Sequence, residues 1–230
     1  MKNIIIVSLL LTINCCNGQI KNTQLNNDTT MEYFDINRYK GWDNDPYYSS
    51  SENHKFLKKE DEKIEIFYHT SGIQVRVKNS KNPYEVVNGF SNKTRRLLAR
   101  GYIFYSVNYG IWKEYDEQGR LIKETDWDKD YEFSLDSLVK KMSKEYEMDL
   151  FNTSKTRNVS RYVEKEHLHL PLYEVWYRAE ANTNEFHCYI IDGNTGETLF
   201  DIVRFMGDEG DGKGSLLGLY LKSLKEEKNK

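Results

Sequence analysis

The chain has 230 residues, of which 30% are charged and 13% aromatic, and its formal net charge is −3 at pH 7. This nearly balanced charge provides no overall field to attract nucleic acid, so we expect no nucleic-acid partner. Tyrosine is the unusual component, with 17 copies against three prolines. Its apolar ring and polar hydroxyl suit half-buried strands and contact surfaces.

The beginning of the chain has the pattern of an export signal. An apolar run of about ten residues follows Lys2 and is too short for a membrane-spanning helix, which needs ~20. Two endings are open: cleavage after Gly18, or lipid attachment at Cys16, which is favoured over Cys15. We therefore expect residues 1–18 to be a signal peptide. The mature protein would then reside in the periplasm, at the outer membrane as a lipoprotein, or in the medium.

Strands are expected to dominate the region after the signal. Residues 19–30 are polar without periodicity, which predicts a flexible tether, and a β-rich domain is expected at 31–132. Apolar residues alternate at 64–68 and 73–77 on either side of a turn at Gly72, which is typical of a hairpin. The same alternation predicts further strands at 83–89, 96–107, 111–115 and 120–125.

A helix interrupts this strand pattern. Ser134 is a candidate N-cap, and Asp136 lies in the first turn, where an acidic residue is favourable. The apolar residues of the helix fall on one face: Leu135, Leu138, Val139 and Met142. Further strands are expected after it, at 172–178, 185–191 and 197–203.

The last segment, residues 205–230, is expected to be an acidic, glycine-rich loop followed by a short amphipathic helix. The apolar face of that helix would contain Leu216, Leu217, Tyr220 and Leu224. The complete pattern predicts an α+β fold. Antiparallel β-hairpins come first, and a module of one helix and an antiparallel sheet follows at 133–204.

One hairpin has a recognisable motif at residues 109–128. Its pattern is met by Gly110, Trp112, Tyr115, Gly119 and Leu121. This segment resembles the MORN-like hairpin repeats of bacterial envelope and toxin–antitoxin-associated proteins, and a fainter copy extends the resemblance to about 84–128. Aromatic residues of one such unit stack on the next unit. The resemblance implies that Trp112 and Tyr115 contribute to a binding surface.

A second resemblance covers residues 134–203. It rests on LYEVWYR at 172–178 and IIDGNTGETLFDI at 190–202, which resemble a PepSY-type module, a helix followed by a curved antiparallel sheet. In the turn of this motif Asp192 can bind backbone NH groups while Gly196 takes a positive φ. The resemblance implies binding and peptidase inhibition rather than catalysis, and we expect Trp176 to take part in binding.

Two histidines are the strongest candidates for metal chemistry. His167 and His169 would lie on one face of a strand, a spacing that can bind zinc. The alternative, two ordinary surface histidines, is favoured because no H-E-x-x-H or paired C-x-x-C motif accompanies them. Cys188 alternates with Phe186 and Ile190, which predicts a buried core residue. We therefore expect no metal and no cofactor.

An acidic stretch imitates the beginning of a calcium loop. Asp126, Asp128 and Asp130 have the right spacing, but Tyr131 stands where such a loop needs glycine. We interpret the stretch as a solvated acidic link between the sheet and the helix.

The sequence contains no G-x-S-x-G motif and no cysteine with a candidate histidine partner. The expected function is therefore that of a non-enzymatic exported binding protein of the bacterial cell envelope, with another protein as its partner. The most specific version is an immunity or inhibitor protein against a secreted toxin or peptidase. The alternatives are a secreted hydrolase or toxin with a site around His167 and His169, and a structural lipoprotein anchored through Cys16.

Overall fold

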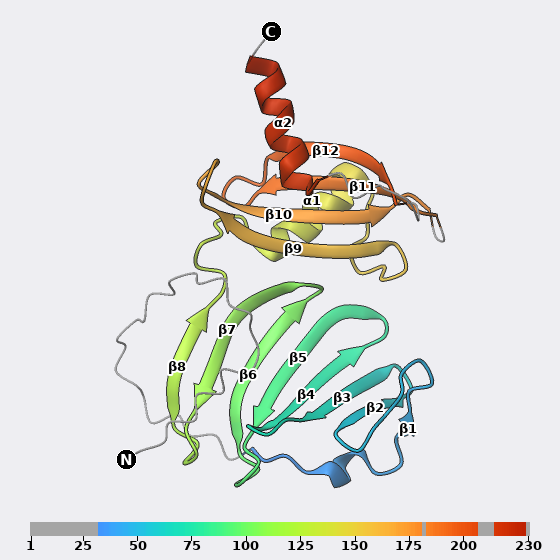
Figure 1. The fold of residues 1–230 in the computed structure, drawn as a ribbon, viewed down its shortest axis with the longest axis vertical. Coiled ribbons are helices and arrows are strands. Elements are labelled where there is room, and N and C mark those ends of the chain that lie inside the picture. The colour runs from blue at the N-terminus through green and yellow to red at the C-terminus, as the bar shows by residue number, and fades with distance from the viewer. Residues whose placement is uncertain (1–31, 181–182, 207–213, 229–230) are drawn as a thin grey trace. The chain divides into compact units, whose positions relative to one another are not determined.

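The chain forms two compact units, shown in Figure 1. The computed structural model describes residues 32–180, 183–206 and 214–228. Both units consist mainly of antiparallel β-sheet, and the two α-helices belong to the second unit, so the fold is α+β. The predicted signal peptide with Cys16, the tether and the loop at 207–213 lie outside the described residues.

The first unit, residues 32–103 and 108–127, is an eight-stranded sheet in which the strand order follows the chain order. A short 3-10 helix at Ile36–Tyr39 precedes the strands. The strands are β1 (Asp43–Asn44), β2 (His54–Lys59), β3 (Glu62–Tyr68), β4 (Ile73–Asn79), β5 (Asn82–Phe90), β6 (Leu97–Phe104), β7 (Val107–Tyr115) and β8 (Leu121–Asp126).

The hairpin of β3 and β4 forms the centre of the first unit's core. It was predicted from alternating apolar residues, and its register places Ile64 opposite Val77 and Ile66 opposite Val75. Period-two alternation places these side chains on one face of the sheet. The aromatic residues that pack on this face precede β2 in the chain: Phe34, Tyr39 and Trp42. Burial of each large apolar side chain contributes about 1.5–3 kcal/mol, so this layer stabilises the unit.

The strand predicted at 96–107 is wrong as a single element, because β6 ends at Phe104 and β7 begins at Val107. Tyr105 takes a positive φ of 53°, an uncommon conformation for a residue with a bulky side chain. Residues 104–107 belong to the second unit, where the Tyr105 hydroxyl donates to the Leu150 carbonyl at 2.8 Å. These contacts are distant in sequence, so no local turn signal revealed the break.

The second unit, residues 104–107 and 128 onward, contains a four-stranded antiparallel sheet in the order β12-β11-β10-β9. Its elements are α1 (Leu135–Tyr146), β9 (Thr156–Glu164), β10 (Leu170–Arg178), β11 (Glu185–Asp192), β12 (Thr198–Phe205) and α2 (Leu216–Lys228). The predicted strands at 172–178 and 185–191 lie within β10 and β11, which pair with each other.

The two helices cover opposite faces of this sheet (Figure 1). On one face, Leu216 and Tyr220 of α2 are buried in a cluster with Cys188 of β11. Tyr189, the next residue of β11, faces the other way, and its ring lies 4.5 Å from the ring of Tyr146 in α1. The predicted burial of Cys188 is confirmed, since its exposed fraction is 0%.

Local capping signals are realised as the sequence predicts. The Ser134 hydroxyl accepts a hydrogen bond from the backbone NH of Ser137 at 3.1 Å, so Ser134 is the N-cap of α1. At the turn between β11 and β12, the Asp192 carboxylate accepts a hydrogen bond from the backbone NH of Asn194 at 2.7 Å, and Gly196 has a φ of 76°.

Among the described helices, none is long and apolar enough to cross a membrane.

Candidate interaction surface

Two of the three predicted binding residues are used for internal packing of the first unit. The Trp112 ring lies directly over Gly101, where an added Cβ would come within 2.2 Å of the ring. Its indole nitrogen donates to the Tyr102 carbonyl at 3.1 Å, and Trp127 contacts it edge-on at 5.8 Å. Tyr115 is partly buried against the core beneath β3 and β4. Their main contacts are therefore structural.

Trp176, the third predicted residue, lies in the second unit and is half-buried. It is partly buried on the sheet face that α2 covers, and the guanidinium of Arg204 lies 5.1 Å from the centre of its ring. Trp176 of β10 pairs with Cys188 of β11, and Cys188 pairs with Ile202 of β12. The tryptophan is thus part of a row that crosses three strands.

The next row across the same strands combines two arginines with a phenylalanine. Arg178 of β10 pairs with Phe186 of β11, and Phe186 pairs with Arg204 of β12. The Arg178 guanidinium lies 5.3 Å from the centre of the Phe186 ring. We call these three residues, together with Trp176 of the neighbouring row, the arginine–aromatic row. Cations stacked on aromatic faces attract anionic groups while they keep an apolar contact area.

The buried thiol of Cys188, next to this row in the sheet, is unsuited to nucleophilic chemistry. Burial raises the pKa of the Cys188 thiol to about 12, and the nearby Arg204 charge only partly opposes that effect. A thiol with so high a pKa is almost entirely protonated at neutral pH, whereas the thiolate is the nucleophile. Cys188 is therefore a core residue of this sheet rather than a candidate nucleophile.

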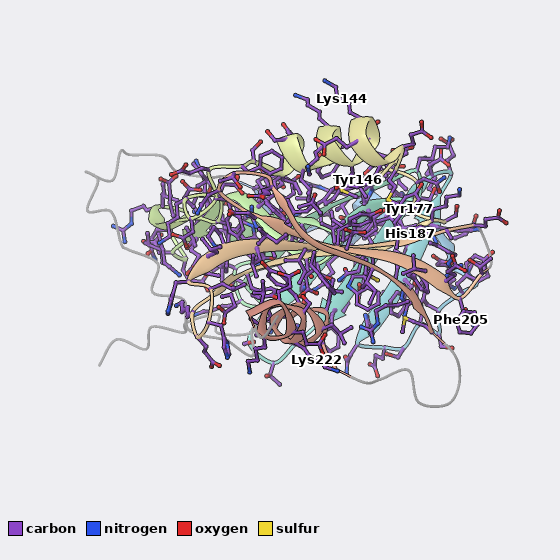
Figure 2. The ribbon with its side chains drawn as sticks, turned by 90° about the horizontal axis from the view of Figure 1, so that it is seen from above. Lys144, Tyr146, Tyr177, His187, Phe205 and Lys222 are labelled. Atoms are coloured by element: carbon purple, nitrogen blue, oxygen red, sulfur yellow. The ribbon has the colours of Figure 1, made fainter. Side chains whose placement is uncertain are left out.

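Exposed apolar side chains also lie along β12 and directly after it, at one margin of the sheet. One of them, Phe205, is labelled in Figure 2. The exposed fractions are 53% for Val203, 62% for Phe205 and 42% for Met206. The alternation of β12 places Val203 and Phe205 on one face and Arg204 on the other. Sequence reasoning missed these residues. The sequence signal that could have found them is that β12 has apolar residues on both faces, with Ile202 on one face and Val203 and Phe205 on the other.

The two candidate zinc ligands do not lie on a strand, so that expectation is wrong. His167 and His169 lie in the connection between β9 and β10, and His169 has a φ of 55°. The buried Glu164 carboxylate organises this turn by accepting backbone NH groups of Glu166, His167 and Leu168 at 2.9, 2.9 and 2.5 Å. Within the described ranges, no group of three or more His, Cys, Asp or Glu residues could hold a metal ion.

The hydrogen bonds in this turn control the ionisation of Glu164. Burial by itself raises the pKa of the carboxyl, but the NH groups of Leu168, His167 and Glu166 outweigh it and lower the pKa to about 2. The Nδ1 atom of His167 lies 3.4 Å from the same carboxylate. The predicted histidine site is therefore a structural turn around an ionised glutamate.

Asp128 of the calcium-like stretch is bound to an arginine. Its Oδ1 atom lies 2.7 Å from Nη2 of Arg161, whose side chain is 4% exposed. The guanidinium also lies 4.4 Å from the centre of the Tyr131 ring. The acidic link is thus partly a counter-ion for a buried arginine, rather than a fully solvated segment.

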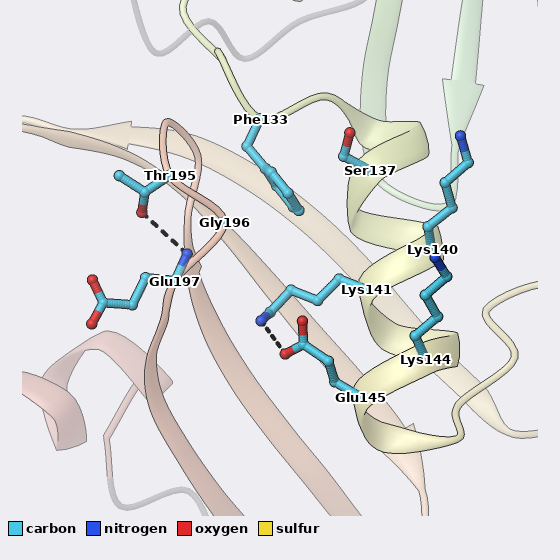
Figure 3. A pocket seen from close by; sticks show the side chains of 9 residues that line it. All are labelled: Phe133, Ser137, Lys140, Lys141, Lys144, Glu145, Thr195, Gly196 and Glu197. Carbon is cyan, nitrogen blue, oxygen red and sulfur yellow. Dashed lines mark hydrogen bonds and ion pairs between the residues drawn. The ribbon is translucent and has the colours of Figure 1, made fainter.

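A shallow groove of about 480 Å³ lies between α1 and the turn that joins β11 to β12 (Figure 3). Its lining residues are Phe133, Ser137, Lys140, Lys141, Lys144, Glu145, Thr195, Gly196 and Glu197. The Lys141 ammonium is paired with Glu145, and the Ser137 hydroxyl contacts Ser134 at 2.9 Å. No histidine, cysteine or aspartate lines the groove. Its side chains are mainly charged, with three lysines and two glutamates.

No protein-family model, curated protein or solved structure matches this chain. The function is therefore inferred from the geometry of β12 and the arginine–aromatic row.

Proposed function

We propose that this chain is an exported, non-enzymatic binding protein of the bacterial cell envelope and that its partner is another protein. The observation that carries the proposal is the cluster of exposed apolar side chains on β12, with Val203 and Phe205 more than half exposed. Contiguous apolar groups at a sheet edge favour association with another chain. On the opposite face of the same sheet margin lie stacked arginines and aromatic rings, which are enriched at protein interfaces.

The proposed location depends on the amino-terminal sequence. The charged Lys2, the apolar run and the small residues Cys16 and Gly18 before the cleavage point favour export. If Cys16 were instead lipidated, it would anchor the protein to a membrane. A moored protein would protect the cell that makes it, whereas a free one could act elsewhere.

The two family resemblances remain part of the proposal. Close packing of Trp112 on Gly101 supports a MORN-like hairpin within 84–128. A helix followed by a four-stranded antiparallel sheet supports a PepSY-like module within 134–203. Together these modules favour an immunity or inhibitor protein that neutralises a secreted toxin or peptidase.

Affinity capture from envelope extracts, followed by reconstitution with the purified partner, tests this function. We expect one partner to be captured by the wild-type chain and to bind it in isothermal titration calorimetry. The Phe205→Lys variant should lose most of this binding. Ile122→Lys is the matched control, because Ile122 is 52% exposed on β8, which is also an edge strand. Failure of every captured protein to bind in purified form would reject the proposal.

A further inference from the structure

Within the described residues, β12 is an edge strand whose outer side pairs with no other strand. One side of β12 pairs with β11, from Glu185 opposite Phe205 to Ile191 opposite Thr198, and no other described strand lies beyond it. Natural edge strands are usually protected by lysine, proline, bulges or short length. The β12–β11 pairing shifts register between Ile190 and Ile191 of β11. The part of β12 that contains Val203 and Phe205 therefore keeps regular strand pairing. The eight residues of β12 include neither lysine nor proline.

The two faces of β12 favour different side chains in an added strand. On one face, Val203 and Phe205 are exposed and apolar, and the acidic residues Asp201 and Glu185 flank them. Additional carboxylates would be repelled there. On the other face, Arg204 is stacked on Trp176, and its positive charge favours a carboxylate. Because side chains of a strand alternate between faces, these preferences alternate along a bound peptide.

Arg178 strengthens the charge preference of the second face. It lies two strands from β12 on the same face as Arg204, with Phe186 between them in register. Among the described residues, Arg178 has no ion-pair partner, and its buried Nε atom has no hydrogen-bond partner. Its uncompensated charge adds to the positive potential beside the edge and attracts acidic segments over several ångströms.

We propose that β12 binds an extended segment of the partner as an added strand, in which apolar residues beside Val203 and Phe205 alternate with acidic residues beside Arg204. This inference rests on the proposed binding function and specifies the chemistry of the partner. Backbone hydrogen bonds to the open edge provide affinity, and the alternating side chains provide specificity and register.

A second copy of this chain is a poorer occupant of the edge. In a symmetric antiparallel pair, residues opposite each other lie on the same face. The β12 residues that share a face with Arg204 are Phe200 and Ile202, so a second β12 would provide no carboxylate for the arginine. Charge complementarity therefore favours an acidic segment of a different protein.

Fluorescence anisotropy with defined probes tests the proposal on the full chain. The probe is a fluorescein-labelled eight-residue peptide in which glutamate and valine alternate. One control peptide has the same composition with the glutamates and valines in two separate blocks, and another has lysine in place of glutamate. We expect saturable binding of the alternating acidic peptide, and binding at least about tenfold weaker for both controls.

Variants then locate the site. Arg204→Glu should weaken binding of the acidic peptide by about tenfold or more and improve binding of the lysine peptide, a reversal that loss of folding cannot produce. Phe205→Lys should weaken binding similarly, while Ile122→Lys should not change it. Equal binding of the alternating and block peptides, or unchanged binding by Phe205→Lys, would overturn the inference. So would a wild-type dimer that Phe205→Lys converts to monomer in sedimentation velocity.

Capture from envelope extracts separates failure of this inference from failure of the proposed function. If Phe205→Lys and Arg204→Glu capture the same partner as the wild type, the β12 inference is wrong while the binding function stands. If the wild-type chain captures no partner that binds in purified form, the binding function itself fails.

Discussion

The Nη2 atom of Arg161 lies 2.7 Å from Oδ1 of Asp128, and this ion pair joins the segment before α1 to strand β9. The two partners differ in burial, since the Arg161 side chain is 4% exposed and the Asp128 side chain is 46% exposed. A buried charge is costly to leave without compensation, whereas an exposed carboxylate can be hydrated. Removal of Asp128 and removal of Arg161 should therefore lower the free energy of unfolding by different amounts.

We predict that Asp128→Ala destabilises the second unit more than Arg161→Met does. The first change removes a carboxylate from a buried guanidinium and should cost about 3 kcal/mol, while the second should cost about 1–2 kcal/mol. Urea unfolding followed by fluorescence measures both free energies of unfolding. Asp130→Ala, at an exposed position of the same stretch, is the control and should be nearly neutral. Equal costs for the two changes would show that burial of Arg161 does not control the energetics.

Gly101 should be intolerant of any side chain because of Trp112. An alanine Cβ would lie within 2.2 Å of the indole ring, so the ring or the strand must move. We expect Gly101→Ala to lower the free energy of unfolding by about 1–3 kcal/mol, the usual cost of overpacking.

Gly89→Ala is the matched control for Gly101→Ala, because both glycines lie in strands of the first unit. A Cβ at Gly89 would meet Ala99 at 3.5 Å, an ordinary contact. This change should be neutral or slightly stabilising, since alanine reduces the flexibility of the unfolded chain. If both variants lose the same stability, the cause is loss of glycine in a strand rather than the clash with Trp112.

The features that sequence predicts correctly are those with short-range signals. The β3–β4 hairpin follows from alternation around Gly72, and α1 follows from the Ser134 cap and a periodic apolar face. The turn at Asp192 follows from side-chain hydrogen bonding within three residues. In each case the interaction that fixes the structure lies within the segment itself.

The features that sequence missed depend on distant partners. Strand β9 reads as polar because it contains Arg161, but that charge is buried against Asp128, 33 residues away in the chain. The Tyr105 turn depends on Leu150, 45 residues away. The candidate site had the same difficulty, since stacking of Arg204 on Trp176 requires the order of β10, β11 and β12.

Cys188 should resist alkylation in the folded protein. It is fully buried, and burial raises the pKa of its thiol to about 12, so little thiolate is present at pH 8. We expect iodoacetamide to leave Cys188 unmodified in native buffer and to modify it completely in 6 M guanidinium, as measured by mass spectrometry of the Cys188 peptide. Fast native modification would mean that the sheet beneath α2 opens readily.

The ionised Glu164 should make the β9–β10 turn sensitive to acid. Its folded pKa is about 2, below the ordinary value of 4.5, so its stabilising contribution is present above pH 4.5 and is lost as the pH falls towards 2. This contribution is at most about 3 kcal/mol at neutral pH. Glu164→Gln removes the charge and leaves a similar shape.

Urea unfolding of the wild type and of Glu164→Gln between pH 2 and pH 7 measures this contribution. We expect the wild type to be more stable by a constant amount from pH 7 to about pH 5, and this difference to shrink below pH 4.5. Glu166→Gln is the control, because the Glu166 side chain is exposed in the same turn. A difference that persists unchanged at pH 2 would mean that the variant disturbs packing. In that case the carboxylate charge would not be what holds the turn.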